Sequence, residues 1–133
     1  MGNPSVAFAL AGAALALSAA AARADPMQVA VLQALDKVSA RVSVLEVPVG
    51  KTVAFGTLEI TARACDKRPP EETPESAAFL EITDKRPGQA PTTPFVGWMF
   101  ASSPALSAME HPVYDVWVLD CKNASSSASG SSP

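Results

Sequence analysis

A segment near the carboxyl end of the chain holds the residue types that hydrolases use. Ser102, Ser103 and Ser107 precede His111, and Asp115 follows it. A hydroxyl, an imidazole and a carboxylate in hydrogen-bonded sequence can activate a nucleophile. The sequence has no Gly-x-Ser-x-Gly elbow, and a second interpretation is that Ser103 caps a short turn while His111 bonds locally. We predict no catalytic residues and keep a small hydrolase using His111, a serine and Asp115 as the alternative.

Metal chemistry would also depend on His111, the only histidine. Zinc usually takes a tetrahedral set of Cys, His and carboxylate ligands. Glu110 and Asp115 are close in sequence, but Pro112 intervenes and strand alternation turns Asp115 toward the Trp117 side. The chain also contains no Gly-rich phosphate loop or nucleotide fingerprint. We therefore predict neither a metal nor a cofactor.

Binding has more support, because large aromatic residues gather in two neighbouring segments. Side chains of this kind are favoured at recognition surfaces. Ordinary core packing is the alternative for Trp98 and Trp117, and we expect Tyr114 to be the most exposed of the aromatic residues. The candidate binding surface, centred on the segment Ser102–Tyr114, comprises Trp98, Glu110, His111, Tyr114, Asp115 and Trp117.

The elements that must position these residues are β-strands. Helix-period stripes are scarce after residue 24, whereas short runs rich in Val, Ile, Phe, Thr and Trp alternate with Pro, Gly and Asp clusters, which favours an antiparallel fold. We predict an all-β sandwich or barrel of about six strands, with one short helix or turn starting at Pro104 before the last strand. The predicted strands are Gln28–Leu35, Ala40–Val47, Thr52–Ala64, Ala77–Asp84, Phe95–Ala101 and Val113–Cys121.

Two patterns refine this prediction. Gly56 interrupts the strand Thr52–Ala64 and predicts a bulge there, after which alternation places Leu58, Ile60, Ala62 and Ala64 on one face. The last two predicted strands are apolar on both faces, which is typical of central strands. The Pro-rich charged segments Asp66–Glu75 and Lys85–Pro94 are expected to be surface loops.

Residues Met1–Ala24 are predicted to be a cleavable secretory signal. The first 22 residues carry no charged side chain, and Ala22-Arg23-Ala24 supplies small residues for cleavage before Asp25. The alternative is a retained transmembrane anchor, although the apolar stretch of about 17 residues is at the low end for a bilayer span. No later apolar run is long enough to cross a membrane, so we predict no stable membrane insertion after cleavage.

The predicted export signal bears on the two cysteines, Cys65 and Cys121, because it implies an oxidising compartment. An even number of cysteines in an oxidising compartment indicates a disulfide. Closing a loop of this length would stabilise the fold by about 4 kcal/mol. A pair of free thiols is the alternative, and the absence of Cys-x-x-Cys spacing disfavours a redox pair.

The remainder of the chain is predicted to form one domain, residues 25–121, followed by a disordered Ser-rich tail, residues 122–133. Thirteen Asp and Glu residues outnumber ten Lys and Arg residues, and one of those ten, Arg23, lies in the predicted signal. Nucleic-acid binding depends on basic residues that neutralise phosphates. The acidic balance therefore argues against nucleic acid and against adsorption to an anionic membrane.

Five strings of the sequence are distinctive together: Leu35-Asp36-Lys37-Val38, Val47-Pro48-Val49-Gly50, Arg68-Pro69-Pro70-Glu71, Gly97-Trp98-Met99-Phe100-Ala101-Ser102-Ser103-Pro104 and Glu110-His111-Pro112-Val113-Tyr114-Asp115-Val116-Trp117. As a set they resemble an uncharacterised family of exported bacterial proteins, domain of unknown function 2155, typical of alphaproteobacteria. The resemblance runs from about Val29 to Cys121 and implies a periplasmic location, but no activity. We expect a soluble periplasmic domain, not an enzyme, that binds a protein or an envelope component; an accessory subunit of an envelope or respiratory complex is a further alternative.

Overall fold

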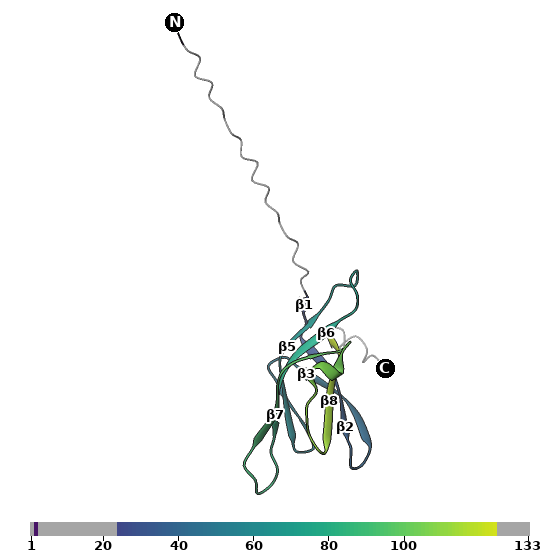
Figure 1. The fold of residues 1–133 in the computed structure, drawn as a ribbon, viewed down its shortest axis with the longest axis vertical. Coiled ribbons are helices and arrows are strands. Elements are labelled where there is room, and N and C mark those ends of the chain that lie inside the picture. Colours follow the sequence, from purple (N-terminus) through teal and green to yellow (C-terminus); the bar gives the residue numbers. More distant parts are fainter. Residues whose placement is uncertain (1, 3–23, 125–133) are drawn as a thin grey trace.

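Two antiparallel β-sheets pack face to face in the computed structural model, which describes residue 2 and residues 24–124 (Figure 1). The all-β prediction is therefore confirmed, with a sandwich rather than a barrel. The predicted signal, apart from Gly2 and Ala24, lies outside the described residues, as does the tail from Ser125 onward.

The larger sheet has five strands. Its main path follows the order β1-β5-β6-β7, and β4 pairs with β5 on the side away from β6. All of its pairings are antiparallel. The strands are β1 (Asp25–Pro26), β4 (Thr52–Phe55), β5 (Leu58–Lys67), β6 (Ser76–Asp84) and β7 (Thr92–Phe100).

The smaller sheet has the order β3-β2-β8. Its strands are β2 (Val29–Asp36), β3 (Arg41–Pro48) and β8 (Tyr114–Lys122), so Lys122, predicted to start the tail, ends a strand instead. A short 3₁₀ turn, η1 (Pro104–Ser107), lies between β7 and β8, where a short helix or turn was predicted. Ser103 precedes it without a side-chain capping bond, so the predicted cap is wrong.

Gly56 marks a hairpin turn rather than a bulge. Phe55 pairs with Leu58, so the predicted strand Thr52–Ala64 is two strands joined by Gly56 and Thr57. Gly56 has φ +58°, and positive φ at the first turn position is the role of glycine in a type II′ hairpin. A Cβ at this position would overlap the Tyr114 ring. This split, together with the short β1, gives eight strands instead of about six.

The prediction that the last two strands are central is wrong, because β7 and β8 are sheet edges. Within the described ranges, β7 pairs only with β6, and β8 pairs only with β2. Pro94 lacks an N–H for a second ladder, which suits an edge position. The apolar outer face of β7 is not covered, since Val96 is 55% exposed and Trp98 is 38% exposed.

The core fills the space between the sheets with inward-facing side chains of alternating strand residues. Burial of these side chains is the main driving force of the fold. The largest of them are almost fully inaccessible: Leu32, Val47, Leu58, Ile60, Leu80, Ile82 and Val118.

A disulfide between Cys65 and Cys121 joins the two sheets, with the Cα atoms 5.7 Å apart. Two β-bulges turn the cysteines toward each other. The β5–β6 register slips at Arg63, and the β2–β8 register slips at Leu119, in each case two residues before a cysteine. Without the extra residue, period-two alternation would turn each cysteine outward. The slip at Arg63 is also why Cys65, and not Ala64 as predicted, continues the buried face.

Candidate functional site

A buried histidine–aspartate pair lies where β6 ends and β8 begins. His111 Nε2 is 2.7 Å from Asp84 Oδ2, and the side chains are 4% and 3% exposed. His111 Nδ1 accepts hydrogen bonds from the backbone N–H groups of Val113 (3.0 Å) and Tyr114 (3.1 Å). Because Nδ1 is an acceptor, the geometry assigns the ring proton to Nε2, which donates it to Asp84. The imidazole therefore has no free lone pair.

Asp84 collects further donors from other elements. Thr57 Oγ1 donates to Oδ1 at 2.5 Å, and Arg86 Nε donates to Oδ2 at 2.9 Å. Burial alone would raise the pKa of Asp84, but the hydrogen bonds from His111, Thr57 and Arg86 outweigh it and hold the pKa below its usual value. The carboxylate thus stays charged, and it ties the β4–β5 turn to the end of β6 and the start of β8.

Two other members of the hydrolase hypothesis, Ser102 and Asp115, are bonded to residues other than His111. Ser102 donates its hydroxyl to Glu75, and Asp115 forms an ion pair with Lys37 at 3.2 Å. A nucleophilic hydroxyl would need to lie within hydrogen-bond reach of the histidine. Both ring nitrogens of His111 already have partners, so the arrangement is that of a structural cross-link.

The six residues of the predicted binding surface do not share one face. Tyr114, expected to be the most exposed aromatic residue, is only 9% exposed, because its ring packs on Phe55 and His111. Trp98 is exposed, whereas Trp117 is half-buried. Strand alternation places Trp98 on the outer face of the large sheet and Asp115 and Trp117 on the outer face of the small sheet, while His111 and Tyr114 are buried and Glu110 is exposed.

A hollow of about 900 Å³ lies on the outer face of the large sheet, under the loop between β5 and β6; we call it the outer hollow. Its size lies within the range of small-molecule pockets. Trp98 stands directly opposite Phe79 on β6, and their rings meet edge to face with centroids 5.6 Å apart. The floor of the outer hollow is formed by Ala77, Trp98 and Phe100, and its rim by Asp66, Arg68, Glu71, Glu72 and Glu75.

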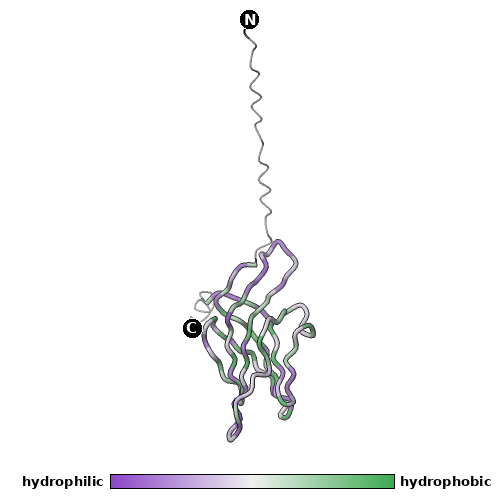
Figure 2. The backbone as a smooth tube through the Cα atoms, turned by 60° about the vertical axis from the view of Figure 1, so that its left-hand side comes forward, coloured by the Kyte–Doolittle hydropathy of each residue, from purple (hydrophilic) through white to green (hydrophobic). Residues whose placement is uncertain are grey.

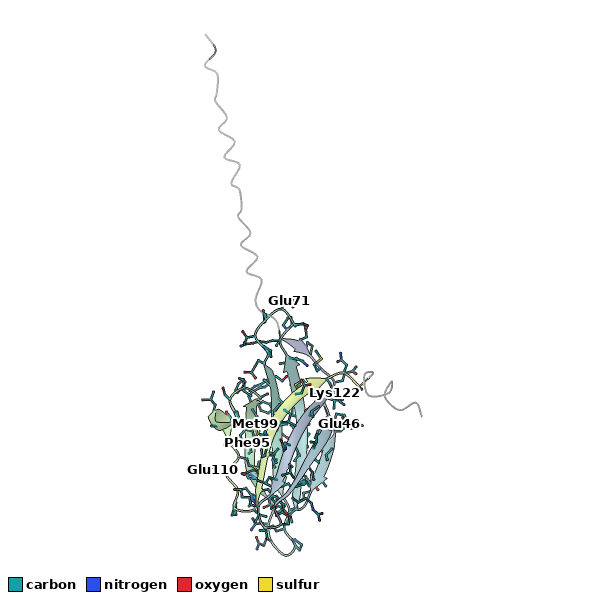
Figure 3. All side chains as sticks on the ribbon, turned by 90° about the vertical axis from the view of Figure 1, so that its right-hand side faces the viewer. Glu46, Glu71, Phe95, Met99, Glu110 and Lys122 are labelled. Carbon is teal, nitrogen blue, oxygen red and sulfur yellow. A yellow bond between two sulfur atoms is a disulfide. The ribbon has the colours of Figure 1, made fainter. Side chains whose placement is uncertain are left out.

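The loop that overhangs the outer hollow is closed at its base. The Arg68 N–H donates to the Glu75 carbonyl at 3.0 Å, and the Glu72 N–H donates to the Pro69 carbonyl at 3.0 Å. Three prolines in the loop fix φ and reduce its freedom. Figure 3 shows Glu71 at the tip of this loop, and Figure 2 colours the loop as hydrophilic. The loop is thus a preformed overhang with restricted conformational freedom, not a flexible linker.

Glu75 joins the loop to the end of β7. Its carboxylate accepts hydrogen bonds from the backbone N–H groups of Ser76 and Ser102, both at 3.1 Å, and from the Ser102 hydroxyl. Burial raises the pKa of Glu75, but these bonds and the nearby Arg68 guanidinium outweigh burial, and the pKa lies below its usual value. Glu75 is therefore a charged fixing point at neutral pH.

Two smaller hollows flank these features. One of about 750 Å³ lies on the other side of the same loop, where Met27, Pro69 and Leu119 contribute to its walls. Another of about 260 Å³ borders the buried pair, next to Glu110 and Arg86. Of the three, the outer hollow is the one that contains Trp98.

Sequence reasoning missed most of the outer hollow. The segment Asp66–Glu75 was expected to be only a surface loop, and Phe79 was not considered. The pairing that sets Phe79 beside Trp98 cannot be read from one strand at a time. A usable signal was present in Glu71-Glu72-Thr73-Pro74-Glu75, where carboxylates stand on a proline-stiffened segment.

Two further properties of the described residues bear on function. No three His, Cys, Asp or Glu side chains in residues 24–124 are grouped so that they could hold a metal ion. Over the same residues, no helix is long and apolar enough to cross a membrane.

Residues 30–121 match the family described as "Uncharacterized protein conserved in bacteria (DUF2155)". The chain is also similar to "Uncharacterized protein RP359" of Rickettsia prowazekii (strain Madrid E), with 32% identity over 88 residues. That match covers 66% of this chain and 57% of the relative, so the chain spans little more than half of the relative's length. No solved structure is significantly similar to the chain.

Proposed function

The chain belongs to the DUF2155 family of uncharacterised bacterial proteins, and from its own geometry we propose that it is an exported, non-catalytic domain that binds a protein or another envelope component. The observation that carries this proposal is the outer hollow, where Trp98 is 38% exposed under a stiffened loop. Exposed aromatic side chains in a concave setting are typical of recognition surfaces.

Export to the periplasm is supported by the apolar leader and by the disulfide. Disulfides form and persist in oxidising compartments and are rare in the cytosol. The bond between Cys65 and Cys121 spans the two sheets, so the fold depends on it directly.

Binding accounts for the geometry better than hydrolysis does. His111 donates to Asp84 and accepts from two backbone groups, which leaves no nitrogen to take a proton from a nucleophile. The outer hollow, in turn, contains neither a histidine nor a serine among its lining residues. Its aromatic floor offers contact area, and its rim offers charge.

Site-specific photo-crosslinking tests the proposal. A photoreactive residue placed at Trp98 should yield an adduct with a partner in the native compartment. The matched control is the same residue placed at Trp117, on the outer face of the small sheet, which should yield none. Equal adducts at both positions, or none at Trp98, would contradict binding through the outer hollow.

The location is tested separately by amino-terminal sequencing of the protein from its native host. Cleavage after Ala24 leaves Asp25 as the first residue. A mature protein that still begins at Met1 would contradict the cleavable signal and favour the anchor.

A further inference from the structure

The floor of the outer hollow is an aromatic surface held in a fixed orientation. Trp98 and Phe100 project from β7 on the same side, and their partners across the ladder are Phe79 and Ala77 on β6. The edge-to-face contact with Phe79 fixes the Trp98 ring while leaving it exposed. The electron-rich faces of such rings attract Lys and Arg side chains within about 6 Å.

The rim of the outer hollow carries more carboxylates than cationic groups. Glu71 and Glu72 have no ion-pair partner in residues 24–124, and the same is true of Asp66. Glu75 is ionised at neutral pH, as shown above. Against these four carboxylates the rim holds one guanidinium, that of Arg68. The outer hollow is therefore complementary to a cation and repels anionic surfaces.

The edge of β7 lies beside this charged and aromatic site. Within the described residues β7 pairs only with β6, so its other edge is not part of any ladder. An extended peptide can add to such an edge through main-chain hydrogen bonds, with alternate side chains directed to one face. On the outer face those side chains would lie next to Val96 and Trp98, which are 55% and 38% exposed.

We propose that the outer hollow binds an extended segment of a partner protein that carries Lys or Arg at alternate positions, with a cation over Trp98 and between the carboxylates of Glu71 and Glu72. This inference rests on the proposed function and names its ligand class. The aromatic floor supplies the contact area, the rim supplies selection by charge, and the edge of β7 selects an extended peptide over a compact cation.

Direct titration of the mature, disulfide-bonded protein tests the inference. The probe is a synthetic peptide as long as β7, nine residues, that alternates Lys and Thr. A Trp117→Phe background leaves Trp98 as the sole tryptophan, so its emission reports the hollow alone. We expect saturable quenching of Trp98 by this peptide, weakening as salt increases, and at least about tenfold weaker binding of the analogue with Gln in place of Lys.

Charge removal supplies the decisive variant, because Glu71 and Glu72 lie on an exposed loop and their change does not threaten folding. The double variant Glu71→Gln/Glu72→Gln should weaken the Lys peptide by about fivefold to tenfold. Glu46→Gln is the matched control: Glu46 is an acidic residue on the outer side of the other sheet, paired with Lys122 (Figure 3), and its loss should leave binding unchanged.

Several outcomes would overturn the inference. One is equal binding of the Lys and Gln peptides, and another is no effect of the double variant. Equally tight binding of spermidine would show selection for a small polycation, and preferential binding of glycan strands would show selection for sugars. If any of these is found while the crosslink at Trp98 persists, the proposed function stands and only its ligand class is wrong; loss of the crosslink as well removes both.

Discussion

The two ends of the sandwich use their acidic groups in opposite ways. At the end where β6 finishes, Asp84 is 3% exposed, and its oxygens accept hydrogen bonds from three side chains. At the other end, Glu71 and Glu72 extend from a stiffened loop above Trp98 without ion-pair partners in residues 24–124. Buried polar groups with all partners present specify a fold, whereas exposed charges beside exposed aromatics are available to a ligand. The difference separates the residues that hold the fold together from those that we propose to contact a partner.

The largest expected effect comes from breaking the covalent link between the sheets. The double variant Cys65→Ser/Cys121→Ser should lose about 4 kcal/mol of the free energy of unfolding, because a long loop in the unfolded chain is no longer closed. Urea denaturation measures this loss. The wild-type protein under reducing conditions serves as the control and should unfold at the same urea concentration as the variant; an unchanged midpoint in both would refute the role of the bond.

The comparison of the two ends predicts the next effect. Asp84→Ala should cost about 2–4 kcal/mol, because it leaves the buried His111 N–H and the Arg86 and Thr57 donors without their acceptor. Glu72→Ala, at the other end, should change the free energy of unfolding by less than about 0.5 kcal/mol. Paired urea denaturation curves test both. Similar losses of the free energy of unfolding in Asp84→Ala and Glu72→Ala would contradict the idea that the acidic groups at the two ends have different roles.

A smaller effect is expected at the β4–β5 turn. Gly56→Ala should cost about 1–2 kcal/mol, because its φ is +58° and a Cβ there would overlap the Tyr114 ring. Gly88→Ala is a matched control, since Gly88 also has positive φ, +75°, but has open space around it. Thermal unfolding should rank Gly56→Ala as the more destabilising change, and equal costs would show that the contact with Tyr114 is unimportant.

The smallest effect is a dependence on pH, because the lowered pKa of Asp84 is a difference between opposing contributions from burial and hydrogen bonding. A carboxyl whose pKa is lower in the folded state stabilises the fold fully above its unfolded pKa, about 4, and this stabilisation is lost as pH falls through the folded pKa. Urea midpoints between about pH 6 and pH 2 should therefore fall less steeply for Asp84→Asn than for the wild type. If the urea midpoints of the variant and the wild type fell equally steeply with pH, a lowered pKa of Asp84 in the folded protein would be contradicted.

Fold class was accessible from the sequence because strand runs and turn residues recur along the chain, and the disulfide followed from the predicted compartment. The edge positions of β7 and β8 were not accessible, since an apolar run on both faces fits a central strand and an uncovered edge equally well. The turn at Gly56 was mistaken for a bulge, because glycine with positive φ serves in both.

The site was harder to predict than the fold. Tyr114 and His111 are polar enough to suggest a surface, yet His111 is buried against Asp84, which is distant in sequence, and Tyr114 packs on Phe55 and His111. Trp98 was correctly included in the candidate surface, but the loop above it was not. That arrangement depends on the pairing of β6 with β7 and on the bond from Ser102 to Glu75, which are long-range features.

The link from Cys65 to Cys121 also divides the chain mechanically. A force applied between β1 and the end of β8 can extend the residues before Cys65, but it cannot extend the covalent ring that holds β6, β7 and most of β8. The two cysteines are separated by 56 positions in the sequence, so the ring conceals roughly 190 Å of contour length at about 3.4 Å per residue. The strand that carries Trp98 lies wholly inside this ring, so a force between β1 and the end of β8 cannot pull it into an extended chain while the disulfide is intact.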